Sequence, residues 1–112
     1  MIGIDIVEVN RIQKLIENAG HKERLFYKEE IDYADSHKHP AIHFAGFFCA
    51  KESVIKALGG GVVTEIKVLH YDNGRPYAVL SGKAKELLGD KKIEISISHT
   101  DSYATAVCMI AE

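Results

Sequence analysis

The chain has 112 residues, a formal net charge of −2 at pH 7, and a composition that is 46% hydrophobic and 27% charged. This length suits one domain with a modest core, so we expect residues 1–112 to fold as a single unit. The small net charge gives no overall attraction to nucleic acid or to a membrane, and no run is long and apolar enough to span a bilayer. Asp5 and Glu8 interrupt the first apolar run and no basic stretch precedes it, so we expect no signal peptide and a cytoplasmic protein.

The two cysteines both lie inside apolar runs. The spacing between Cys49 and Cys108 is not that of metal ligands. Free cysteines often pack as small hydrophobic residues, and reduced thiols are typical of cytosolic proteins. We therefore expect both to be reduced core residues.

The first 35 residues predict a strand followed by helices. The β-branched run 1–9 is typical of a buried strand, Asn10 can cap a helix that Gly20 would end, and the polar stretch 24–35 predicts short helices. Alternate strand positions point to opposite faces. One face would carry Ile2, Ile4 and Ile6, and the other Gly3, Asp5, Val7 and Val9.

The rest of the chain predicts a long helix and two hairpins. Pro40 suits the first turn of a helix that runs to about residue 58, where three glycines stop it. The Asn73-Gly74 pair predicts a hairpin between 62–71 and 77–80, followed by a helix after Ser81 and by strands at 93–98 and 103–110. We predict an α+β fold, with an antiparallel β-sheet, a long central helix and short flanking helices.

Asp5 is the only charged residue on a strand face that otherwise contains residues typical of a core, Gly3, Val7 and Val9. A buried carboxylate is costly unless it is paired or bound to a cation, and aspartate is disfavoured within strands. Gly3 lies on the same face and predicts room beside Asp5 for a ligand. Two interpretations stay open: a metal ligand, or a core aspartate held by backbone amides or an arginine.

Glu52 and Lys56 lie four positions apart on one face of the long helix. A surface ion pair would be the simpler interpretation, but Phe48 and Cys49 border the same face and indicate partial enclosure. Together with Asp5 and the later His99, these residues suggest a divalent-metal site that handles phosphates. The glycine turn that follows, with Gly60 at its centre, could bring backbone amides to an anion or could simply end the helix.

Two sets of histidines are candidate functional residues. His99 ends a strand of alternating apolar residues, so it is either a half-buried core residue or a donor to a phosphate oxygen. His37, His39 and His43 flank Pro40 without a cysteine or carboxylate at zinc spacing, and we favour a solvated loop for them.

The segment between Arg11 and Lys28 has five basic residues against two acidic ones, an excess of three positive charges. Such a segment is either a solvated helix face or a docking patch for an acidic partner. Four of the basic residues would form that patch: Arg11, Lys14, Lys22 and Arg24.

Four short motifs are distributed over nearly the whole chain: GIDIVEV at 3–9, FCAKESVIKA at 48–57, NGRP at 73–76 and SISHT at 96–100. In this order they resemble the holo-[acyl-carrier-protein] synthase family of phosphopantetheinyl transferases. The resemblance implies transfer of the 4′-phosphopantetheine arm from coenzyme A to a serine of an apo acyl carrier protein, with release of adenosine 3′,5′-bisphosphate.

The resemblance also implies roles for individual residues. Asp5 and Glu52 would hold Mg²⁺, which Mn²⁺ can replace in an all-oxygen site. Lys56 would neutralise a phosphate, and either Glu52 or a metal-bound water would act as the base. Gly60, His99 and Thr100 would contact the coenzyme. Members of the family are homotrimers with sites between subunits, and their acidic carrier proteins would dock on the basic segment.

Two departures from the family pattern support an alternative. Phe47 stands where the family usually has arginine, and the stretch 61–66 looks shorter than usual. A phosphate contact would then be absent or supplied by Lys38 or His39. The alternative is a non-catalytic trimeric coenzyme A-binding or scaffold protein, and a metal-dependent phosphohydrolase of unrelated origin is a third hypothesis. The four motifs favour the transferase.

Overall fold

A computed structural model describes the whole chain, residues 1–112. Strand β1 (Ile2–Glu8) leads into three short helices and one long one: α1 (Val9–Ile16), α2 (Ala19–Leu25), α3 (Lys28–Asp35) and α4 (Pro40–Leu58). The second half contains one turn of 3₁₀ helix (Val63–Glu65), β2 (Ile66–His70), β3 (Pro76–Leu80), α5 (Gly82–Leu88), β4 (Lys92–His99) and β5 (Tyr103–Ala111). None of these helices combines the length and the apolar character needed to cross a membrane.

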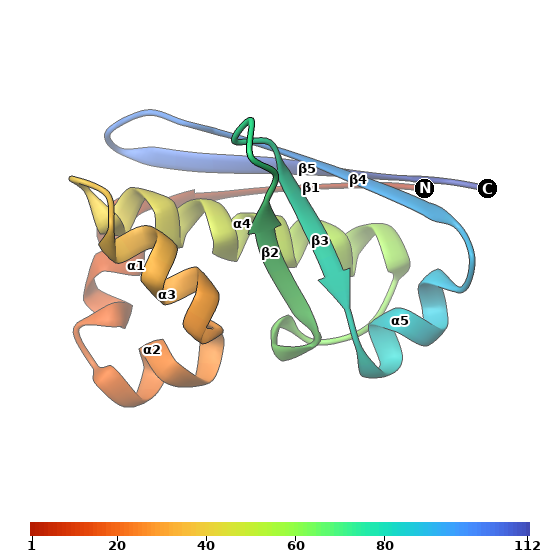
Figure 1. Cartoon of the computed structure of the whole chain (residues 1–112), viewed down its shortest axis with the longest axis horizontal. Coiled ribbons are helices and arrows are strands. Elements are labelled where there is room, and N and C mark those ends of the chain that lie inside the picture. The colour runs from red at the N-terminus through yellow and green to blue at the C-terminus, as the bar shows by residue number, and fades with distance from the viewer.

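The strands form two antiparallel sheets, one in the order β1-β5-β4 and one made of β2 and β3. Helix α4 runs along one face of the three-stranded sheet, and β2 and β3 lie across the helix (Figure 1). Helices α1 to α3 gather near the start of α4, whereas α5 lies near its end (Figure 1). The predicted α+β fold with a long central helix is confirmed.

Two predicted boundaries are wrong because side chains close local turns. The helix expected from Asn10 to Gly20 ends at Ile16, and Asn18 starts a new helix when its Oδ1 accepts a hydrogen bond from the His21 amide at 3.0 Å. The strand expected from Val62 begins only at Ile66. There the Glu65 carboxylate accepts a hydrogen bond from the Val62 amide at 3.0 Å and holds one turn of 3₁₀ helix.

Helix α4 has the predicted limits. Pro40 occupies its first turn, and Gly59 ends it with a φ of 76°, a left-handed conformation that suits glycine. Ten of its nineteen residues are buried, including Phe44, Phe47 and Val54. The helix is therefore the centre of the hydrophobic core, and any side chain on its few exposed positions is held on a rigid support.

Strand β1 approaches the backbone of α4 very closely at Gly3. A Cβ atom at this position would lie 2.0 Å from the Ser53 carbonyl oxygen and 2.7 Å from the Ala57 amide nitrogen. The expected room for a ligand beside Gly3 is thus occupied by α4, and that prediction is wrong. Glycine is required here for packing.

A buried ion pair joins α4 to its other neighbours. Lys51 Nζ lies 2.6 Å from Glu30 Oε1 and donates to the Leu25 carbonyl at 2.9 Å, and both charged side chains are fully buried. Glu30 also accepts hydrogen bonds from the amides of Tyr27 at 2.7 Å and Val68 at 2.8 Å. This one carboxylate therefore connects α3, α4 and β2.

The three-stranded sheet leaves an apolar face uncovered. Ile2, Ile4 and Ile6 are 67%, 64% and 66% exposed, and Met109, the strand partner of Ile2, is 59% exposed. Three β-branched residues in a row at this exposure are unusual for a surface open to water.

We expect Gly3→Ala to lower the free energy of unfolding by about 3 kcal/mol or more, because the new methyl group can be accommodated only if β1 and α4 move apart. Urea denaturation would measure it. Gly20→Ala is the matched control. Gly20 lies within α2, where alanine favours the helix, so stability should stay within about 1 kcal/mol of the wild type. Equal effects of the two substitutions would contradict the close packing at Gly3.

We expect Lys51→Met to destabilise the protein by about 3–5 kcal/mol, because it leaves the Glu30 carboxylate buried without a counter-charge. Adding Glu30→Gln should restore part of the loss, so that the double variant is more stable than the sum of the two single effects predicts. Strict additivity in a double-mutant cycle would show that the two charges do not interact.

Candidate active site

Asp5 lies in the middle of β1 and faces α4. Its Oδ1 is 3.3 Å from Lys56 Nζ, which also donates to the Ile4 carbonyl oxygen at 3.0 Å. The Asp5 side chain is 18% exposed and that of Lys56 is 55% exposed. Asp5 is held neither by backbone amides nor by arginine, and Lys56 pairs with it rather than with Glu52. The lysine has a further N–H free for an incoming group.

Glu52 shares this environment. Burial raises the pKa of its carboxyl group, the negative charge of Asp5 raises it further, and the positive charges of Lys56 and Arg11 oppose the rise. Asp5 and Glu52 are thus close enough to repel one another. The positive charges of Lys56 and Arg11 reduce the rise in the pKa of Glu52 but do not cancel it.

The two carboxylates fit a magnesium ion better than a transition metal. The structure contains no group of three or more histidine, cysteine or acidic side chains arranged to hold a metal by themselves. Mg²⁺ is commonly held by one or two carboxylates, with water and substrate phosphates completing its shell. A cation between Asp5 and Glu52 would also relieve their repulsion, and the donor set therefore fits the expected ion.

Cys49 lies beside this pair but is not available for chemistry. Its thiol donates to the Ala104 carbonyl oxygen at 3.3 Å, and burial, followed by the charge of Asp5, raises its pKa to about 12. Burial likewise raises the pKa of Cys108 to about 11. Both cysteines are free and buried, as predicted.

His99 and Thr100 lie away from the carboxylates, at the turn between β4 and β5. Both are exposed, so the interpretation of His99 as a half-buried core residue is wrong. The Thr100 hydroxyl oxygen accepts hydrogen bonds from the amides of Ser102 at 3.2 Å and Tyr103 at 3.1 Å, which shape the turn. The ring of His99 faces that of His43, with centroids 6.3 Å apart, near the start of α4.

Gly60 lies at the opposite end of α4 from His99. The amides of Gly59 and Gly60 both donate to the Ile55 carbonyl oxygen, at 2.8 and 3.3 Å. The Gly60 amide is therefore already used in ending the helix. Its proposed contact with the coenzyme stays a prediction.

A pocket of about 220 Å³ between α4, β2 and β4 is lined by ring side chains; we call it the histidine pocket. Its rings are those of Tyr33, His43, Phe47, His70 and His99. Tyr33 stacks on His70 at a centroid distance of 3.8 Å, and His37, just outside, lies 4.3 Å from His43. His43 is a half-buried residue of α4 and not part of a solvated loop, which corrects that expectation.

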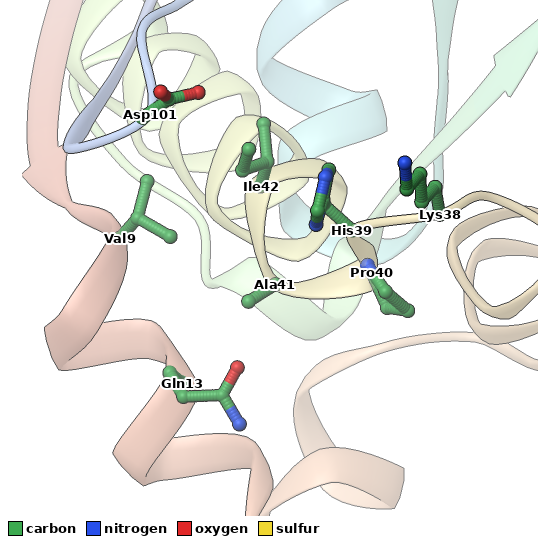
Figure 2. Close-up of a pocket in the computed structure, with 8 residues that line it drawn as sticks. All are labelled: Val9, Gln13, Lys38, His39, Pro40, Ala41, Ile42 and Asp101. Atoms are coloured by element: carbon green, nitrogen blue, oxygen red, sulfur yellow. The ribbon is translucent and has the colours of Figure 1, made fainter.

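Phe47 is a core residue. It is 2% exposed, and its ring lies 5.7 Å from those of Tyr33 and His70. Lys38 and His39 line a different cavity, of about 410 Å³, at the start of α4. Figure 2 shows these two residues with Pro40 on one side of that cavity, and Val9, Gln13 and Asp101 on the other.

The four basic residues proposed for docking do not form one uniform patch. Arg11 and Lys14 are exposed on α1 and line an open hollow with Glu8 and His21. Lys22 is partly buried, 3.6 Å from Asp35, and its ammonium lies over the Phe44 ring. Arg24 borders a smaller hollow on α2. Three of the four side chains, those of Arg11, Lys14 and Arg24, are therefore exposed to a partner, whereas the charge of Lys22 is partly compensated by Asp35.

Sequence reasoning missed two features. The pair of Lys51 and Glu30 was not predicted, although a lysine inside the otherwise apolar half of α4 was a signal that a buried counter-charge must exist. The histidine pocket was not predicted either, because its rings come from separate elements.

Comparison with known proteins agrees with this arrangement. Residues 1–108 match the 4′-phosphopantetheinyl transferase superfamily. The holo-[acyl-carrier-protein] synthase of Caldanaerobacter subterraneus is 44% identical over 116 aligned positions, covering 96% of this chain and 91% of the relative.

Solved structures of holo-[acyl-carrier-protein] synthases are also similar to this chain. The holo-[acyl-carrier-protein] synthase of Helicobacter pylori in complex with coenzyme A superposes with a TM-score of 0.86 at 31% identity, covering 99% of this chain and 100% of that one. The corresponding protein of Bacillus anthracis, in complex with coenzyme A (3′,5′-ADP), has a TM-score of 0.82 at 32% identity, covering 97% and 93%.

The chain therefore belongs to the 4′-phosphopantetheinyl transferase superfamily and, within it, to the family of holo-[acyl-carrier-protein] synthases. The expected fold and the expected class of enzyme, a phosphopantetheinyl transferase, are confirmed.

We expect the histidine pocket to make the ligand-free protein sensitive to acid. Burial, followed by the charge of His37, lowers the pKa of His43 and of His70, and His99 and His70 lower that of His43 further. As the pH falls below about 6.5, the unfolded chain binds protons that the folded chain does not, so stability falls until the folded-state pKa values are reached. Thermal unfolding at pH 7.5 and 5.5 would measure this.

The double variant His43→Asn and His70→Asn should lose less stability between these pH values than the wild type. His21→Asn, at an exposed position of α2, is the control and should behave like the wild type. An unchanged pH dependence in the double variant would contradict the assignment.

Proposed function

We propose that this protein transfers the 4′-phosphopantetheine arm of coenzyme A to a serine of an apo acyl carrier protein in a reaction that needs Mg²⁺. The serine oxygen forms a bond to the phosphorus that carries the pantetheine. The bond from that phosphorus to the bridging oxygen breaks, and adenosine 3′,5′-bisphosphate leaves. The names of the relatives and the coenzyme A in two of their structures support this substrate pair.

One observation carries the proposal: Asp5, Glu52 and Lys56 lie near one another where β1 packs against α4. Asp5 and Glu52 would hold Mg²⁺, which supplies charge stabilisation for the pyrophosphate. Lys56 would bind a phosphate oxygen through its free N–H. Phosphoryl transfer of this kind requires mainly positioning and charge compensation, so few side chains suffice.

Either Glu52 or a metal-bound water would accept the serine proton. The nucleophile belongs to the carrier protein, which accounts for the absence of an activated serine or cysteine near the pair.

We further propose that the protein works as a homotrimer. The uncovered sheet face with Ile2, Ile4, Ile6 and Met109 is apolar enough to bury against a second copy. His99 lies near His43, whereas Glu52 and Lys56 are nine and thirteen positions further along α4. At the rise of an α-helix these separations are about 13 and 20 Å. We propose that each coenzyme lies at a boundary between two copies, with Glu52 from one copy and His99 from the next, as the resemblance to the family implies.

The remaining expectations belong to the same proposal. Residues 1–112 would form one transferase domain around a single core cluster of 20 buried residues. The acidic carrier protein would dock on Arg11, Lys14 and Arg24, with Lys22 at the edge. The two free, buried thiols suit a reducing compartment, which supports a cytoplasmic location.

We expect an apo acyl carrier protein, incubated with this protein, coenzyme A and Mg²⁺, to gain the mass of one phosphopantetheine group, and a chelator to prevent the gain. Asp5→Asn and Glu52→Gln should each lower kcat/KM by about 100-fold or more, because each removes one of the two carboxylates that would hold the Mg²⁺ needed to stabilise the reacting pyrophosphate. Intact-mass spectrometry would follow the reaction.

Glu86→Gln, at an exposed position of α5, is the matched control and should keep full activity. Retained activity in both Asp5→Asn and Glu52→Gln would overturn the site assignment. No mass gain on several carrier proteins would favour the coenzyme A-binding scaffold, with Phe47→Arg as the next variant.

We expect Ile4→Lys to convert the trimer to monomers, because it places a charge in the middle of the apolar sheet face. Sedimentation velocity would measure the change, with Val79→Lys, at an exposed position of β3, as the control that stays trimeric. A wild-type protein that sediments as a monomer would refute the proposed assembly.

A further inference from the structure

Lys51 and Glu30 are the only charged residues of the chain that are fully buried. Moving two charges out of water has a large desolvation cost, and apolar side chains of similar volume often stabilise a core equally well. Packing alone therefore does not account for this pair. The hydrogen bonds that the two side chains make to the backbone indicate a further role.

The pair holds both sides of the link between α2 and α3. The Leu25 carbonyl group belongs to the last turn of α2, where carbonyl groups lack a partner within the helix, and Lys51 Nζ donates to it at 2.9 Å. The ammonium group also lies at the negative end of the α2 dipole. On the other side of the link, Glu30 accepts a hydrogen bond at 2.7 Å from the amide of Tyr27, the N-cap residue of α3. One ion pair thus caps the end of one helix and the start of the next.

Helix α2 depends on this link for its position. It has seven residues, and none of them is buried. Apart from the surface ion pair of Lys22, its anchors lie at its C-terminal end, where Lys51 holds Leu25 and the following residue, Phe26, is 3% exposed. Arg24 is exposed directly before Leu25. The position of the Arg24 backbone therefore follows that of the link.

The same pair connects the link to the candidate active site, because Lys51 and Glu52 are consecutive residues of α4. In the proposed function, on which this inference rests, a serine of the docked carrier protein must reach Asp5 and Glu52. A misplacement of about 1 Å between reacting groups can cost much of the rate of a reaction. The docking residue Arg24 must therefore be held at a fixed position relative to Glu52.

We propose that Lys51 is a positioning residue for the carrier protein: paired with Glu30, it holds the α2–α3 link and so fixes Arg24 relative to Glu52. Lys51 is fully buried and acts through Arg24 rather than by contact with a substrate. Its removal should therefore weaken the use of the carrier protein and leave the use of coenzyme A unchanged.

Steady-state kinetics of the full-length protein test this, with Lys51→Met and Glu30→Gln combined so that neither charge stays buried alone. We expect KM for the apo acyl carrier protein to rise about three- to fivefold, the size of one exposed charge contact, while kcat and KM for coenzyme A stay within about twofold of the wild type. Lys85→Met with Glu86→Gln, both at exposed positions of α5, is the matched control and should keep the wild-type constants.

A double-mutant cycle separates positioning from a general loosening of the fold. Arg24→Ala should raise KM for the carrier protein in the wild type but hardly further in the combined variant of Lys51 and Glu30, because the contact of Arg24 is already lost there. Lys14→Ala, on α1, should raise KM by the same factor in both backgrounds.

Three results would overturn the inference and leave the proposed function intact. They are an unchanged KM for the carrier protein, an equal change in KM for coenzyme A, and an effect of Arg24→Ala that is as large in the combined variant as in the wild type. If the combined variant does not fold, amide hydrogen exchange of the wild type decides. Slow exchange at Phe26 and Tyr27 would support a fixed link, and exchange as fast as at the exposed start of α2 would overturn it. If the wild type transferred nothing, the proposed function would fall together with the inference.

Discussion

The close approach of β1 to α4 is the contact on which the candidate active site depends. Gly3 has no side chain, and the strand can therefore lie directly against the helix backbone at Ser53 and Ala57. Asp5 is two positions further along the same strand face, which places its carboxylate beside Lys56 and near Glu52. The two acids come from distant parts of the chain, and their repulsion persists because the packing around them is rigid.

Lys51 and Glu52 are adjacent on α4 but lie in different surroundings. Lys51 points into the core, where Glu30 compensates its charge and ties α3 and β2 to the helix. Glu52, one position on, is near enough to Asp5 for the charge of Asp5 to raise its pKa. Because β2 ends in His70, the buried pair that holds β2 also fixes one wall of the histidine pocket. The fold thus places the carboxylates of Asp5 and Glu52 and the imidazole-lined pocket at different parts of one helix.

Local signals in the sequence predict much of this structure. Pro40, Gly59 and the Asn73-Gly74 turn define α4 and the β2–β3 hairpin, and the alternation in 93–98 defines β4. The sequence groups Asp5, Glu52 and Lys56 in one site, but the direct ion pair between Asp5 and Lys56 could not be predicted. The pair of Lys51 with Glu30 could not be predicted either, because it joins segments far apart in the chain. The same holds for the tight space at Gly3, which depends on the distance between two backbones. The order of the motifs indicates which residues belong to the candidate site, whereas the fold determines which of their side chains are in contact.

The central claim is that one chain supplies only part of each active site. Asp5→Asn and His99→Ala, each expected to be nearly inactive alone, should be coexpressed with different tags and purified as mixed trimers. If Asp5 of one subunit works with His99 of the next, about one quarter of the sites in a random mixture contain both intact residues, and activity returns to about that fraction of the wild type. Activity no higher than that of the single variants would contradict a site shared between subunits.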